Sequence, residues 1–167
     1  MQVQIEDARL RQAAQQDMDA FLQAVADAII QQAGGELTAA AMAQLNAEQV
    51  TLWGYMLLRD ELMDGGFVQM IHNGYGPFFF ENPFAKAMRL WGLREFSKLL
   101  YKAKQAYDAH KEDLTRERTD EEFMAMFEQY PVFDDLDDEF VEAEEDITAA
   151  VAHYVDEHIN DFVEIEQ

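Results

Sequence analysis

The sequence predicts an all-α protein, a single compact domain of six or seven helices with an N-terminal helical extension. Apolar residues recur at a spacing near 3.6 over most of the chain, and no segment shows the sustained alternation of a strand. Capping patterns and Gly or Pro breaks separate the periodic segments. The 167 residues, of which 49% are hydrophobic, are enough to bury one core.

The first part of the chain is expected to form three helices. A long apolar repeat predicts one helix over residues 3–33, which Gly34 and Gly35 end. A short helix is expected after Thr38. Asn46 and Gln49 have the spacing of a capping box, so they predict the start of a helix that continues to Asp64. We therefore divide the chain into an extension, residues 1–45, and a main domain, residues 46–167.

A segment rich in glycine and aromatic residues follows, over residues 65–84. Its glycines predict sharp turns on either side of a short helix over residues 67–71, and its aromatic residues are expected in the core. The alternative is a pocket for a small ligand or a partner, lined by Gln69, His72 and Asn73.

Two further helices are expected before residue 118. Asn82 and Pro83 have the order of an N-cap and a first helical residue, and Gly92 would end the helix that they open. The apolar spacing over residues 93–114 predicts an amphipathic helix with its basic residues on the outer face.

The last part of the chain predicts two more helices. Thr119 and Glu122 form a second capping box and predict a helix to about Gln129. Pro131 is expected to break it. The final helix is expected from residues 135–137 to Phe162.

Charge is distributed very unevenly along the chain. The net charge is −22, made up of −8 over residues 1–85, +4 over residues 86–118, and −18 over residues 119–167, which contain no Lys or Arg. Such a chain repels nucleic acid and anionic membranes and attracts basic surfaces. There is no cysteine, no signal-peptide pattern and no apolar run that could span a bilayer, so we expect a cytoplasmic protein.

The densest acidic stretch is DDLDDEFVEAEED, residues 134–146. Its nine carboxylates are Asp134, Asp135, Asp137, Asp138, Glu139, Glu142, Glu144, Glu145 and Asp146. Acids near a helix N-terminus complement the macrodipole, which would account for residues 134–139. The whole stretch would give about one charge per 2 Å of helix, close to the one per ~1.7 Å of duplex DNA. The pattern therefore indicates a surface that can replace DNA phosphates.

Other chemistry finds little support in the sequence. An EF-hand frame over residues 135–146 has Phe140 where a glycine is needed, which argues against a calcium loop. His153 and His158 are five residues apart, about 140° around a helix, so they cannot share one zinc ion from one face. There is no phosphate-binding glycine loop and no nucleophile motif. The sequence therefore gives little support for a metal-dependent enzyme.

Three segments resemble a known protein family. RDELMDGGFVQMIHNGYG (59–76), YPVFDDLDDEFVEAEED (130–146) and AAVAHYVDEHINDF (149–162) are similar to the bacterial DNA-mimic proteins, over roughly residues 48–164. The resemblance implies a small acidic all-α protein of the cytoplasm. It also implies a role without catalysis and without a cofactor, in which carboxylates occupy the DNA-binding surface of a transcription factor or nucleoid protein.

The leading hypothesis is therefore an acidic binding protein whose partner is a basic DNA-binding protein. The nine carboxylates would contact that partner, helped by Asp120, Glu121 and Glu122. One alternative is an immunity or inhibitor protein that covers a basic nuclease toxin. A second is a protein that uses residues 65–80 to bind a small ligand or a metal. A third is an acidic helical domain whose charge serves solubility alone. The sequence leaves open whether the chain forms a homodimer.

Overall fold

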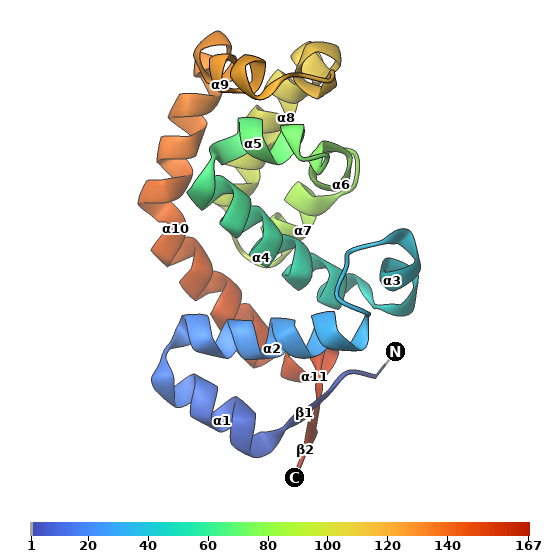
Figure 1. Cartoon of the computed structure of the whole chain (residues 1–167). Helices are drawn as coiled ribbons and strands as arrows, with labels where there is room; N and C mark the ends of the chain where they lie inside the picture. Colours follow the sequence, from blue (N-terminus) through green and yellow to red (C-terminus); the bar gives the residue numbers. More distant parts are fainter. Residues whose placement is uncertain (1) are drawn as a thin grey trace. The chain divides into compact units, whose positions relative to one another are not determined.

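The computed structural model describes residues 2–167, and helices make up most of this part of the chain (Figure 1). Backbone contacts divide the chain into two compact units. Unit 1 contains the residues up to Met56 together with Thr148–Gln167, and unit 2 contains Leu57–Ile147. The boundaries fall inside the two helices α4 (Ala47–Asp64) and α10 (Pro131–Glu157).

Unit 1 combines helices with one short pair of strands. Strands β1 (Gln4–Glu6) and β2 (Glu164–Glu166) pair in parallel with Ile5 opposite Ile165, so the two ends of the chain lie side by side. The remaining elements are α1 (Asp7–Gln16), α2 (Met18–Gln32), α3 (Ala39–Gln44), α11 (Ile159–Phe162), the start of α4 and the end of α10. The first and last segments of the sequence therefore belong to one unit.

Unit 2 is built around an aromatic core. Its elements are α5 (Gly66–His72), α6 (Gly76–Phe80), α7 (Phe84–Leu90), α8 (Arg94–Thr115), α9 (Asp120–Gln129), the end of α4 and most of α10. Phe67 lies in stacked or tilted contact with Phe80 and Phe133, with ring centroids 6.4 and 6.1 Å apart. Phe140 of α10 meets Phe96 of α8 at 5.7 Å. These rings fix one face of α10 to the core.

The all-α class and the two predicted capping boxes are confirmed. The Asn46 side chain accepts a hydrogen bond from the Gln49 amide at 2.8 Å, and the Gln49 side chain accepts one from the Asn46 amide at 3.0 Å. Thr119 and Glu122 make the same reciprocal pair at the start of α9. Six helices have ten residues or more, and the other five in residues 2–167 are short.

The prediction of one helix over residues 3–33 is wrong. The chain forms β1, then α1, and then turns at Asp17, whose extended backbone (φ −172°, ψ 177°) separates α1 from α2. The Asp17 side chain caps α2 by accepting a hydrogen bond from the Ala20 amide at 2.7 Å. The local cap therefore outweighs a continuous apolar repeat.

The boundaries of the last helix also differ from the prediction. Helix α10 begins at Pro131, four residues before the earliest predicted start, because proline suits the first position of a helix. It ends at Glu157, and His158 separates it from α11. The His158 ring stacks on Tyr154 with centroids 4.1 Å apart, and its Nδ1 atom lies 2.8 Å from the Tyr154 carbonyl oxygen.

Two smaller differences concern the segment around residue 80. The sequence did not predict α6, and α7 begins at Phe84, with Pro83 rather than Asn82 in the capping position. No helix within residues 2–167 is long and apolar enough to cross a membrane.

Candidate protein-docking surface on helix α10

The nine carboxylates of residues 134–146 differ in exposure according to their position around helix α10. Its apolar residues Phe133, Leu136, Phe140 and Ile147 are buried in unit 2. Seven carboxylates are exposed: Asp134, Asp135, Asp138, Glu139, Glu142, Glu145 and Asp146. At 3.6 residues per turn these seven occupy an arc of about 140°, centred opposite the buried face. They form one continuous acidic face, called the α10 acidic face below.

The acidic face is not an N-terminal capping feature. Because α10 begins at Pro131, only Asp134 lies in its first turn. The macrodipole acts within the first turn, so it does not account for the other six exposed acids. The interpretation that helix capping explains residues 134–139 is therefore wrong.

The two remaining carboxylates of the stretch point inward and have partners in unit 2. The Asp137 Oδ1 atom accepts a hydrogen bond from the Phe67 amide at 2.8 Å, at the first turn of α5. Glu144 Oε1 lies 3.8 Å from Arg59 Nη1, and these two side chains are only 16% and 13% exposed. Both carboxylates hold α10 to the rest of the unit and are poorly placed to meet a partner.

Asp137 also explains why residue 66 is a glycine. Gly66 has a φ of +77°, and a Cβ atom added there would lie 2.2–2.7 Å from the carboxylate of Asp137. Burial raises the pKa of Asp137 from its ordinary 3.8 to about 7, against the Phe67 hydrogen bond, which lowers it. The nearby carboxylates of Asp134 and Asp138 raise it further. The glycine at position 66 therefore leaves room for the side chain of Asp137, which comes from the acidic stretch.

The α10 acidic face has no internal counter-charge. Within residues 2–167, none of its seven carboxylates makes an ion pair. Three of the five basic residues of α8 pair with acids outside the face: Lys98 with Glu95, Lys104 with Asp108, and Lys111 with Glu81. The face is thus available to cations from outside the protein.

The charge density of the face is close to that of a nucleic acid backbone. Residues 134 to 146 span about 18 Å of helix axis, so seven charges give about one per 2.6 Å. This lies between one per ~3.4 Å for a single DNA strand and one per ~1.7 Å for the duplex. The face is less dense than the count of nine acids suggested.

Two apolar side chains flank the acidic face. Val132 is 46% exposed and Val141 is 50% exposed. They lie on opposite sides of the arc, at about 90° from its centre.

Elsewhere in unit 2, Asp120 and Glu121 of α9 are exposed, whereas Glu122 is engaged in the cap of α9 and in an ion pair with Arg116 at 3.4 Å.

The three residues considered for a ligand pocket have structural partners. Gln69 donates from Nε2 to Glu61 and Asp64 at 2.9 and 3.0 Å, and Asn73 donates to Glu61 at 3.0 Å. His72 stacks on Phe123 with ring centroids 4.3 Å apart. These contacts favour a structural role for the three residues, in joining α5 to α4 and α9.

The residues considered for metal binding are spread along helices. Residues 135–146, the EF-hand frame, lie within the continuous helix α10 with Phe140 fully buried. No group of three or more His, Asp or Glu side chains that could hold a metal ion occurs within residues 2–167.

The prediction from sequence assigns all nine acids to partner binding and does not identify Asp137 and Glu144 as inward-pointing side chains. A pattern could have separated them, because Phe133, Asp137, Phe140, Glu144 and Ile147 follow the 4–3–4–3 spacing of one helix face. A carboxylate at such a position faces the core and needs a partner.

Comparison with known proteins shows the family to which the chain belongs. The family described as "DMP19-like protein" matches residues 43–158. A protein of Neisseria meningitidis serogroup B, named "DNA mimic protein DMP19", is 30% identical over 157 residues, which cover 92% of this chain and 93% of the relative. This match extends into residues 1–45, where the sequence alone showed no resemblance. The chain belongs to the DMP19-like family of DNA-mimic proteins.

Proposed function

We propose that this chain binds a basic DNA-binding protein, such as a transcription factor or nucleoid protein, by presenting the α10 acidic face in place of DNA phosphates. Lys and Arg side chains of the partner would then meet carboxylates instead of the DNA backbone. Occupation of that surface excludes DNA and so changes transcription or DNA packaging. Such partners act in the cytoplasm of bacteria, which fits the expected location.

One observation carries the proposal: seven exposed carboxylates share one helix face, and none of them pairs with a Lys or Arg within residues 2–167. Seven pairs among them are three or four residues apart, and each pair destabilises the helix by ~0.2–0.5 kcal/mol. The fold thus keeps an arrangement that costs about 1.4–3.5 kcal/mol in total. The Lys and Arg side chains of a basic partner would offset this repulsion between the carboxylates.

The proposal predicts fast and salt-sensitive association. Opposite potentials can raise association rates to 10⁸–10⁹ M⁻¹s⁻¹ at low salt. The screening length is ≈ 8 Å at physiological ionic strength and ≈ 3 Å at 1 M, so high salt should release the partner. The exposed Val132 and Val141 would add short-range apolar contact at the edges of the face.

The test is affinity capture from the native cell lysate at low salt, followed by release with a salt gradient and by competition with duplex DNA. The proposal expects a DNA-binding protein that both salt and DNA displace. The four-acid variant, with Asp135→Asn, Asp138→Asn, Glu142→Gln and Glu145→Gln, should lose this protein. These four residues lie on the acidic face and make no ion pair within residues 2–167.

The matched control removes the same charge elsewhere. Glu36→Gln, Glu112→Gln, Glu117→Gln and Glu128→Gln are four exposed acids outside α10, so the control has the same net charge as the four-acid variant. It should keep the partner. If both variants lose it equally, total charge rather than the acidic face governs binding. If the four-acid variant keeps it, the docking surface lies elsewhere.

A further inference from the structure

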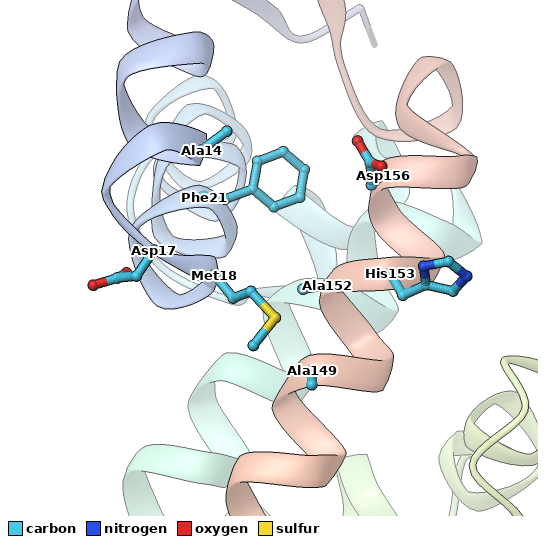
Figure 2. A pocket seen from close by; sticks show the side chains of 8 residues that line it. All are labelled: Ala14, Asp17, Met18, Phe21, Ala149, Ala152, His153 and Asp156. Carbon is cyan, nitrogen blue, oxygen red and sulfur yellow. The ribbon is translucent and has the colours of Figure 1, made fainter.

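Unit 1 contains a cavity that the proposed docking surface does not use. Its volume is about 290 Å³, and it lies between α1, α2 and the C-terminal part of α10 (Figure 2). The lining residues are Ala14, Asp17, Met18, Phe21, Ala149, Ala152, His153 and Asp156. The cavity is at the lower end of the ≈ 300–1,000 Å³ range of small-molecule sites, a size that suits one side chain better than a large ligand.

The walls of the cavity are mainly apolar. Three of the eight lining residues are alanines, and their small side chains leave the space open. Phe21 is 8% exposed and its ring extends from α2 toward α10, while Met18 is 52% exposed at the rim (Figure 2). The cavity therefore offers an aromatic ring and methyl groups to a visiting chain.

One carboxylate stands at the edge of this apolar space. Figure 2 shows Asp156 on α10, on the side that faces Phe21, whereas the side chains of Asp17 and His153 point away from the gap. Asp17 is engaged in capping α2, and His153 lies 3.0 Å from Glu157. Asp156 is exposed and has no ion pair within residues 2–167.

Unit 1 supplies almost no cation of its own. It contains twelve Asp or Glu and only two bases, Arg9 and Arg11, which gives a net charge of −10. Arg11 is paired with Asp7 at 2.7 Å. No Lys or Arg within the described residues lines the cavity. Asp156 is therefore open to a cation from another molecule.

We propose that this cavity binds an alkyl chain that ends in a guanidinium or ammonium group, carried by an Arg or Lys side chain of a basic partner protein. Such side chains lay their methylene stems on apolar surface while the charged group stays at the edge. The stem would contact Phe21 and the alanines, and the charged group would meet Asp156. The negative face of the Phe21 ring would attract the cation further.

The choice of a protein-borne cation rests on the proposed function, which already requires a basic partner. The cavity would give that partner an anchor in unit 1, separate from the α10 acidic face in unit 2. It has an apolar part that phosphate mimicry lacks, so it would add specificity to an attraction that is mainly electrostatic.

The test needs no partner protein, so it can fail or succeed independently of the proposed function. The methyl groups of Met18, Ala14, Ala149 and Ala152 are followed by NMR in the whole chain during titration with n-butylguanidinium. The proposal expects saturable shifts centred on these methyls. n-Butylurea, which has a similar shape but no charge, should bind at least fivefold more weakly.

Three variants localise the site. Asp156→Asn should weaken n-butylguanidinium binding at least fivefold, and Ala149→Leu, which fills a half-buried part of the wall, should abolish it. Glu36→Gln removes one charge from an exposed residue of unit 1 that is not part of the lining, and it should bind as the unmodified chain does. Shifts that are spread over all acidic surfaces, or that are equal for n-butylurea, would overturn the proposal.

A final binding comparison distinguishes a cation carried by a protein from a free polyamine. A blocked peptide with one Arg between apolar residues is compared with spermidine, a free polyamine. The proposal expects the peptide to bind more tightly, because only the peptide supplies apolar contact beyond one side chain. If spermidine shifts the same methyls at lower concentration, the site belongs to a free polyamine and the assignment to a partner side chain is wrong.

Discussion

The pKa of Asp137 predicts that unit 2 becomes less stable as the pH rises from about 4 to about 7. The pKa of this carboxyl is about 7 in the fold and 3.8 ordinarily, so in this window the folded chain holds a proton that the unfolded chain has lost. The free energy of unfolding therefore falls with rising pH, and the contribution of the neutral carboxyl is lost as the pH passes 7.

The magnitude follows from the size of the shift. Each pKa unit corresponds to 1.36 kcal/mol, so a shift of about three units would give ~4 kcal/mol. Asp137 is only half-buried, and water at the edge of α10 screens part of this energy, so we expect about 2 kcal/mol. Asp137→Asn keeps an oxygen that can accept the hydrogen bond from the Phe67 amide but cannot ionise.

The assay is urea unfolding at pH 5 and pH 8, followed by circular dichroism. At pH 8 Asp137→Asn should be about 2 kcal/mol more stable than the unmodified chain, and at pH 5 the difference should shrink. Asp138→Asn removes the same charge from the exposed face and should show a smaller dependence on pH. A difference for Asp137→Asn that is equal at both pH values, or a loss of stability at pH 8, would refute the reasoning.

Three further predictions concern the turn, the cap and the acidic face. Gly66→Ala should destabilise the chain by about 2 kcal/mol or more in thermal unfolding, because it forces φ +77° on a residue with a Cβ and displaces Asp137; an unchanged melting temperature would contradict this role for Gly66. Thr119→Ala removes the cap of α9 and should cost about 1 kcal/mol in urea unfolding, whereas Thr119→Ser should retain most of it. The four-acid variant should be more stable than the unmodified chain by about 1.4–3.5 kcal/mol at low salt, with a smaller gain in high salt. A four-acid variant that is less stable would show that these side chains support the fold.

The helix caps and the charge pattern could be predicted because their causes lie within a few residues. The Asn46–Gln49 and Thr119–Glu122 pairs satisfy amide groups at the start of their own helices, so spacing alone identified them. The net charge of the last 49 residues and the absence of bases there are likewise properties of the chain itself.

The errors arose where a periodic pattern crossed a local break. Apolar spacing continues through Asp17, yet the chain turns there because the Asp17 side chain caps α2. Pro131 predicts the end of the preceding helix, but it also opens α10, so most of the acidic stretch lies beyond the first turn of that helix. At both positions one helix ends and the next begins. Apolar periodicity alone does not show such a boundary.

By itself, the sequence determined the all-α class, the caps and a concentrated acidic stretch in one amphipathic helix. The tertiary structure alone decided which of those acids are available. Asp137 meets the Phe67 amide, 70 residues away in sequence, and Glu144 meets Arg59. The physical reason is that a carboxylate is either buried with a partner or exposed, and the partner is supplied by packing between helices that are distant in the chain.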